Sequence, residues 1–322
     1  MLNLIYNEWI KIFSRVGTWV MIGILGVSMV GFALLSNHFS SDEANPKWKQ
    51  ELQAENADMK KQIKDNPGND ILVKNLKKEI AVNEYRIEHN LPADTGYTAW
   101  SYVTDSSMLT MLTGLFTIII AAGIVANEFN WGTIKLLVIR PLSRFQILLS
   151  KYITVLLFGL GLLLFLFVGS TLLGLLFFGT GGDAAANVHL VYKDGHVVEQ
   201  NIIGYLAKTY LYESISAFML ATMAFMLSAV FRNSSLAVGF SIFLLVMGST
   251  ATGFLAMKFD WAKYILFANT DLTQYLDGTP LVEGMTMTFS IVMLVIYFVI
   301  FQLLAFGVFL KRDIATEQKK DV

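Results

Sequence analysis

The sequence predicts an all-α membrane protein with six transmembrane helices, and two observations support this. First, 55% of its 322 residues are hydrophobic and only 15% are charged, whereas a soluble domain carries about 25% charged residues. Second, several apolar stretches reach the roughly 20 residues that a helix needs to cross a bilayer. The six predicted spans are residues 16–36, 108–126, 152–178, 202–231, 236–257 and 285–310.

The composition also excludes several functions. The chain has no cysteine, which excludes disulfides, thiolate metal sites and cysteine nucleophiles. Its net charge of −1 gives no general attraction to nucleic acid. The sequence contains no G-x-x-x-x-G-K-[ST] phosphate loop, so we expect that this chain does not hydrolyse ATP. We therefore expect no enzyme activity, no cofactor and no metal site.

Residues 1–15 have the pattern of an amphipathic helix. Apolar residues recur at three- and four-residue steps, and polar residues, among them Glu8 and Lys11, avoid that stripe. Such a helix suits the membrane–water interface, and we favour that interpretation. The alternative is that the segment is the frayed start of the first span.

Residues 37–107 form the first long loop, and we expect a helical hairpin in it. Two charged segments with helical periodicity, Pro46–Lys64 and Asp70–His89, are separated by the turn sequence Asn66-Pro67-Gly68-Asn69. The alternative is a solvated charged loop that binds no ligand.

Residues 179–201 form a second loop, for which the sequence predicts a β-hairpin. Asp194-Gly195 is a favourable turn, and centring the turn there places Lys193 opposite His196. His189 then lies opposite Gln200, roughly 13 Å along the ribbon from His196. That distance is too long for a shared metal ion, so we interpret both histidines as structural.

Residues 258–284 are too polar to span a bilayer, yet they contain short apolar segments. They are compatible with short re-entrant or interfacial helices, or with an ordinary interfacial loop rich in aromatic residues.

The predicted fourth span carries two further features. Small residues follow one another at spacings of four, three and four, which favours close helix packing; they are Ala217, Ala221, Ala224 and Ser228. Glu213 lies near the outer boundary, where we interpret it as a headgroup-level charge rather than an ion-pathway residue.

The distribution of lysine and arginine predicts the orientation. The chain ends and the loops at residues 127–151 and 232–235 carry more of these residues than the short loops on the other side. By the positive-inside rule both termini, including the tail at residues 311–322, are cytoplasmic.

The connector at residues 127–151 is much longer than a simple turn requires. We expect a short helix at Ile134–Ile139, ended by Pro141, with Leu136 and Leu137 available to fill a groove on a partner. Ser143 and Gln146 form a capping-box pattern that predicts the start of the next helix. We also expect Glu128 to pair with Arg144, either within the chain or with the partner.

The connector resembles the first cytoplasmic loop of ABC-2-type transporter permeases, the membrane subunits of one class of ATP-driven exporter. The matching residues are Glu128, Gly132, Thr133, Pro141, Ser143, Arg144 and Lys151. The resemblance implies a coupling helix that docks on a separate ATPase subunit, and outer half-helices between the fifth and sixth spans.

The resemblance gives expectations for function. It implies a permease of the bacterial plasma membrane that pairs with a second copy or a related permease. Its substrate would be amphiphilic, such as a peptide antibiotic. The alternative is a membrane sensor, with the outer hairpin as receptor and the connector as an adaptor dock.

Overall fold

The computed structural model describes residues 1–39, 47–68, 70–92, 97–133, 142–180, 188–193, 195–231, 233–276 and 280–311. Most of these residues are helical, and six helices are long and apolar enough to cross a membrane. The six-span prediction is therefore confirmed at the level of helix number, length and composition. The six are α2 (Val16–Phe39), the α5–α7 helix (Ala99–Asn130), α9 (Arg144–Phe177), α10 (Ile202–Phe231), α11 (Ser234–Ala256) and α13 (Met287–Lys311).

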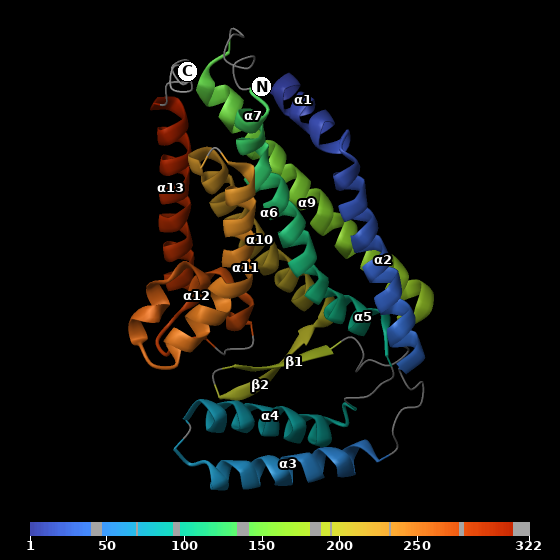
Figure 1. Ribbon diagram of the computed structural model, residues 1–322. Coiled ribbons are helices and arrows are strands. Elements are labelled where there is room, and N and C mark those ends of the chain that lie inside the picture. The colour runs from blue at the N-terminus through green and yellow to red at the C-terminus, as the bar shows by residue number, and fades with distance from the viewer. Residues whose placement is uncertain are drawn as a thin grey trace.

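The six helices lie side by side in a bundle, with the short N-terminal helix α1 (Leu2–Phe13) at one end (Figure 1). The C-terminal end of α13 lies at that same end. At the opposite end, helices α3 (Trp48–Asp65) and α4 (Asp70–His89) form a separate layer (Figure 1). We call these the terminal end and the outer end.

The second span is a composite helix. It starts at α5 (Ala99–Ser106), which is capped by the Thr98 side chain, and continues through the turn η1 (Ser107–Leu109). It then runs through α6 (Thr110–Ile124) into α7 (Ala126–Asn130). The hydroxyls of Thr110, Thr113 and Thr117 donate to backbone carbonyls of this same helix, as expected for threonines in a span.

Helices α6 and α10 lie at the centre of the bundle and supply many of its fully buried residues. Helix α9 packs closely against α6, because a Cβ at Gly159 would lie 2.9 Å from the Thr117 methyl carbon. The hydroxyls of Tyr152 and Thr222, 2.8 Å apart, join α9 to α10. These contacts place the first turns of α9 firmly against the core.

Helix α9 begins inside the connector, at the position that the capping-box pattern predicts. The Ser143 hydroxyl accepts from the Gln146 N–H at 3.2 Å, and the Gln146 side chain accepts from the Ser143 N–H at 3.3 Å. This reciprocal pair confirms the predicted capping box and starts the helix at Arg144. The first two turns of α9, which mix polar and apolar residues, thus continue directly into the apolar span.

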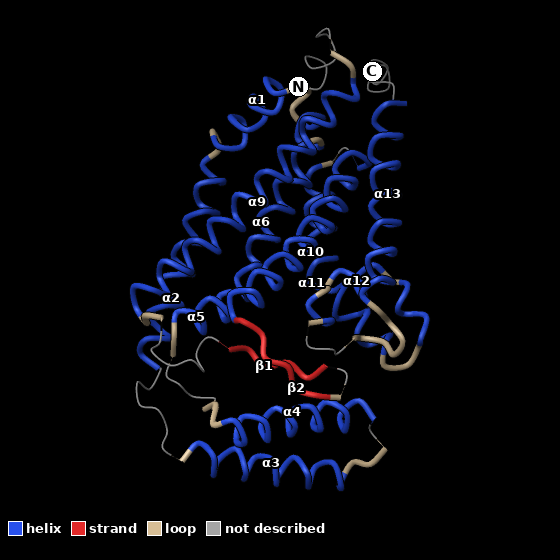
Figure 2. The backbone as a smooth tube through the Cα atoms, turned by 180° about the vertical axis from the view of Figure 1, so that it is seen from behind, coloured by secondary structure: helices blue, strands red, loops and turns tan. Residues whose placement is uncertain are grey.

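The outer end contains two packed helices and a β-hairpin. Helices α3 and α4 bury Met59, Leu76 and Ile80 between them. Strands β1 (Val188–Lys193) and β2 (His196–Asn201) pair with the predicted register, because His189 lies opposite Gln200 and Lys193 opposite His196. The hairpin lies between α4 and the helix bundle (Figure 2).

His189 is a structural residue within the described part of the hairpin. Its ring stacks on Tyr205 of α10, with centroids 3.6 Å apart. Burial, together with the nearby Arg86 guanidinium, lowers the pKa of His189 to about 4. The imidazole is therefore neutral at physiological pH.

Three short helices follow α11, namely η3 (Asp260–Tyr264), α12 (Leu266–Thr270) and η4 (Thr273–Tyr275). Asn269 on α12 is fully buried, and it accepts from the Ser290 hydroxyl of α13 at 2.7 Å. Its amide donates to the backbone carbonyls of Lys263 and Ile265. These bonds hold the segment against the outer end of α13.

Candidate functional site

Four charged side chains meet at the terminal end, and we call Glu8, Lys11, Glu128 and Lys151 the ion cluster. The Lys151 ammonium donates to Glu8 at 2.8 Å and to Glu128 at 3.0 Å. Lys11 donates to the same two carboxylates, at 3.1 Å and 3.0 Å. Two positive and two negative charges therefore balance within one set of contacts.

The cluster joins three elements that are far apart in the sequence. Glu8 and Lys11 lie one turn apart on α1, Glu128 lies on α7, and Lys151 lies two turns into α9. The Lys151 side chain is only 1% exposed and those of Glu8 and Glu128 are at most 9% exposed, whereas that of Lys11 is 43% exposed. Lys151 is thus the buried centre of the cluster, and Lys11 closes it on the solvent side.

The connector residues that follow Glu128 return to it. Gly132 adopts a φ of +70°, which a side chain would strain, and it forms a turn after α7. This turn brings the Thr133 hydroxyl to the Glu128 carboxylate, to which it donates a short hydrogen bond. Gly132 and Thr133 therefore complete the polar surroundings of Glu128.

Buried charges are stable only when they are paired and hydrogen-bonded. Each carboxylate of the cluster contacts both ammonium groups, and Glu128 also accepts from Thr133. Burial lowers the pKa of Lys11, but the carboxylates of Glu8 and Glu128 outweigh that effect and the pKa is raised. Lys11 therefore stays protonated at neutral pH and keeps the cluster electrically balanced.

A second contact fixes the helix that carries Glu128. The Ser228 hydroxyl of α10 accepts from the backbone N–H groups of Val125 and Ala126, at 3.2 Å and 3.0 Å. The bonds fall where α6 ends and α7 begins, so a side chain of α10 replaces the helical partners of these two amides. The position of Glu128 thus depends on α10 as well as on α1 and α9.

The structure brings together only part of the predicted site. Thr133 is hydrogen-bonded to Glu128, Gly132 forms the turn between them, and Ser143 caps α9 two turns before Lys151. The predicted helix Ile134–Ile139 lies outside the described residues, as do the docking residues Leu136 and Leu137 and the helix-ending Pro141.

The expected pairing of Glu128 with Arg144 within the chain is wrong. Glu128 pairs with Lys11 and Lys151, whereas the Arg144 guanidinium donates to the backbone carbonyl of Leu310 at 3.3 Å. Helical geometry explains the difference. Lys151 lies on the buried face of α9, whereas Arg144 is only half-buried and lies beside the end of α13.

Sequence reasoning missed Glu8 and Lys11 as members of the site, and it named Lys151 only as a matching residue of the resemblance, without a partner. We expected the N-terminal helix to lie at the membrane–water interface and assigned no partner to its polar face, yet Glu8 is buried and Leu2 is largely exposed. The available signal was Lys151, a charged residue at the start of a long apolar span that needs an acidic partner.

The small-residue stripe of α10 is largely internal to this chain. Ala221, Ala224 and Ser228 are fully buried, and Ala217 is half-buried. Their burial, and the bonds of Ser228 to α6 and α7, account for the small residues within a single chain.

Comparison with known proteins places the chain in a family. A family described as "Protein of unknown function (DUF2705)" matches residues 71–315. The uncharacterized protein YhcI of Bacillus subtilis (strain 168) is 78% identical over 315 residues, which cover 98% of this chain and all of that protein. The uncharacterized membrane protein YdbK of the same organism is 36% identical over 226 residues, 70% of this chain and 87% of that protein. The family match extends from α4 to beyond α13, and the chain therefore belongs to the DUF2705 family.

Proposed function

We propose that this membrane protein is the permease subunit of an ATP-driven exporter of the bacterial plasma membrane. In this proposal both termini are cytoplasmic, and a separate subunit binds and hydrolyses ATP. The observation that carries the proposal is the ion cluster, because it ties the connector to α1 and α9 at the end of the bundle where an ATPase would dock.

The physical argument concerns transmission of movement. A connector that only reversed the chain would not need buried charges, since turns form with polar residues exposed to water. Breaking one side of a buried ion pair costs about 3–5 kcal/mol, so α1, α7 and α9 resist separation. A displacement of the connector would therefore move all three elements together, as coupling to an ATPase requires.

Two further observations support the proposal. Among the ABC-2-like residues, Thr133 is hydrogen-bonded to Glu128, and Gly132 forms the turn between them. The sequence also has no phosphate loop of its own, which fits a division of labour between two proteins. The proposed partners are an ABC-type ATPase and a second permease, either a copy or a related chain.

The proposed substrate is an amphiphile such as a peptide antibiotic. The described spans present mainly leucine, phenylalanine and other apolar side chains on their exposed faces. Such surfaces suit a molecule with a large apolar part better than a hydrophilic ion.

Affinity purification of the tagged chain from native membranes tests the proposal. We expect an ATPase with a phosphate loop to be recovered in near-stoichiometric amount. Lys151→Met should reduce its recovery, whereas Lys60→Met, which removes an exposed ion pair at the outer end, should not. Recovery of a histidine kinase or another signalling protein in place of an ATPase would contradict the proposal.

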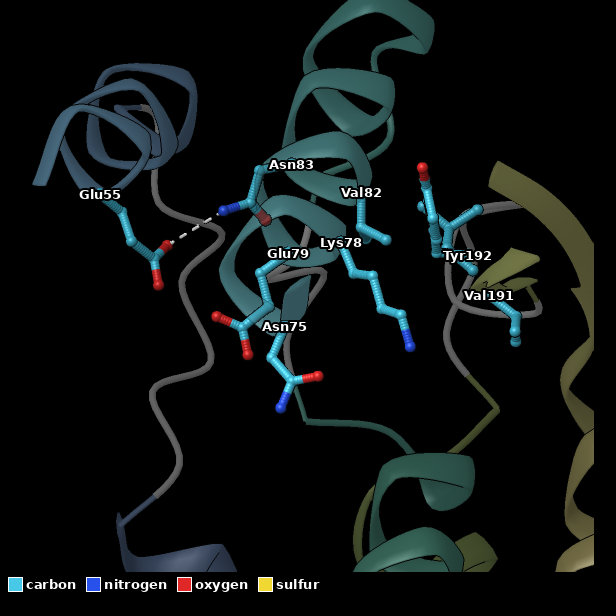
Figure 3. Close-up of a pocket in the computed structure, with 9 residues that line it drawn as sticks. Glu55, Asn75, Lys78, Glu79, Val82, Asn83, Val191 and Tyr192 are labelled. Carbon is cyan, nitrogen blue, oxygen red and sulfur yellow. Dashed lines mark hydrogen bonds between the residues drawn. The ribbon is translucent and has the colours of Figure 1, made fainter. Parts of the chain in front are cut away.

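A membrane sensor is the second candidate, and a cleft at the outer end favours it. The cleft has a volume of about 360 Å³ and lies between α4, α3 and strand β1 (Figure 3). Lys78, Glu79 and Asn83 of α4 line one side and Tyr192 of β1 lines the other. Replacing residues 47–92 by a short linker distinguishes the two candidate functions. A sensor would lose its response to ligand, whereas a permease would still recover its ATPase.

A further inference from the structure

We propose that a groove at the terminal end binds an anionic phospholipid from the surrounding leaflet. The groove lies between α2, α6 and α11 and has a volume of about 370 Å³. Its lining residues come from these helices, from α7 and from the turn before α2, namely Arg15, Gly17, Thr18, Met21, Ile119, Ile120, Gly123, Asn127, Ser234, Ser235 and Val238.

The described residues of the groove carry one positive charge and no acid. Arg15 is the one charged residue among those that line it, and within the described chain no carboxylate lies within ion-pair distance of its guanidinium. Its Cζ atom lies 4.9 Å from the ring centroid of Trp131, so the planar group stacks on the indole. Stacking fixes the guanidinium while leaving its N–H edge available for a phosphate.

Polar groups lie at the same level as Arg15. The Asn127 side-chain amide makes no hydrogen bond to the described residues, and it occupies the space above Gly123. A Cβ at Gly123 would lie 2.7 Å from the amide nitrogen of Asn127. Glycine at position 123 therefore leaves the space that this amide occupies. Ser234 and Ser235 are the first two residues of the 23-residue helix α11, and they add their backbone N–H groups to the groove. The next N–H group, that of Leu236, already donates to the Asn233 side chain.

The lining becomes apolar with depth. Ile119 lies eight residues before Asn127 on the same helix, which is roughly 12 Å along the axis. Met21 and Val238 similarly lie one to two turns inward of Arg15 and Ser234. A polar, positively charged mouth above an apolar floor matches a phospholipid, whose phosphate sits at the interface and whose acyl chains extend inward.

The charge identifies the class of lipid. A zwitterionic headgroup carries its own cation, which would compete with Arg15 for the phosphate, whereas an anionic headgroup such as phosphatidylglycerol does not. One basic residue near the membrane surface favours an anionic lipid by roughly 1 kcal/mol, which is about fivefold in affinity. The proposal is independent of whether the chain is a permease or a sensor.

Native mass spectrometry of the delipidated full-length protein tests this. We expect the first phosphatidylglycerol to bind about fivefold more tightly than the first phosphatidylcholine. Arg15→Gln should bring this ratio close to one. Lys311→Gln, which removes a charge at the same end of the bundle but outside the groove, should leave the ratio unchanged.

A second variant tests the same groove independently, in case Arg15→Gln does not fold. Ser235→Glu adds an acid to the first turn of α11, where it favours the helix, but repels an anionic headgroup. It should therefore abolish the preference in a folded protein. Equal losses in Arg15→Gln and Lys311→Gln would overturn the proposal, since the preference would then follow from total charge. Displacement of the lipid by millimolar glycerol 3-phosphate would also overturn it, because the groove would then recognise the phosphate alone.

Discussion

Removal of Lys151 is the most informative perturbation of the ion cluster. In Lys151→Met a side chain of similar length but no charge replaces an ammonium that is 1% exposed and contacts two carboxylates. Lys11, whose side chain is 43% exposed, would be the one cation of the cluster left to Glu8 and Glu128. Breaking a buried ion pair from one side costs about 3–5 kcal/mol. For a chain of this size each kcal/mol lowers the melting temperature by roughly 2–4 °C, so we expect a decrease of at least about 6 °C.

The matched control is the exposed pair between Lys60 and Glu84, joined at 2.9 Å. Both side chains are more than half exposed, so Lys60→Met should cost under about 1 kcal/mol and lower the melting temperature by no more than about 4 °C. The assay is thermal unfolding of the detergent-purified protein, followed by loss of the monodisperse peak in size-exclusion chromatography.

A double-mutant comparison separates the buried charge from simple packing. Removing Glu8 together with Lys151, as Glu8→Gln and Lys151→Met, takes away one charge of each sign. The double variant should therefore be less destabilised than the sum of the two single variants. Equal shifts for Lys151→Met and Lys60→Met, or strictly additive shifts in the double variant, would refute the reasoning.

Three further predictions concern other parts of the chain. In this cysteine-free protein, Ser143→Cys should react with impermeant thiol reagents only from inside and Asn69→Cys only from outside; labelling of both from one face would refute the proposed orientation. The pKa of His189 is about 4, below its ordinary value of about 6.5, so the stability it contributes is complete above pH 6.5 and is lost as the pH falls toward 4. Amide exchange of residues 188–201 should therefore become faster in that range, after correction for the intrinsic rate, and His189→Gln should reduce the change. Gly159→Leu should destabilise the bundle by about 1–3 kcal/mol through overpacking against α6, whereas Gly161→Leu, with open space at its Cβ, should melt near the wild-type temperature.

The features that follow from local chemistry were predictable from the sequence. The six apolar helices follow from the length that a bilayer requires, and the capping box at Ser143 from the spacing of two side chains. The register of the β-hairpin follows from its turn, because a two-residue turn fixes every later pair.

The partners of buried charges were not predictable in the same way. Glu8 lies on the polar face of an amphipathic pattern, and the pattern does not distinguish a face turned to water from one turned to another helix. Glu128 and Arg144 were matched by charge along the connector, whereas the real partner Lys151 is selected by the face of α9 that packs on α1. Such choices depend on tertiary packing, which helical periodicity alone does not encode.

The bonds from Ser228 to the amides of Val125 and Ala126 have a mechanical consequence. One oxygen of α10 accepts from two successive amides at the junction of α6 and α7. Helix α7 is therefore anchored on α10 as well as on α6, and it would pivot about the Ser228 hydroxyl. A torque on the connector would therefore reach α10 at the centre of the bundle through the Ser228 hydroxyl, in addition to the route through the ion cluster. Loss of that oxygen would let α7 rotate with less effect on α10, without removing any charge.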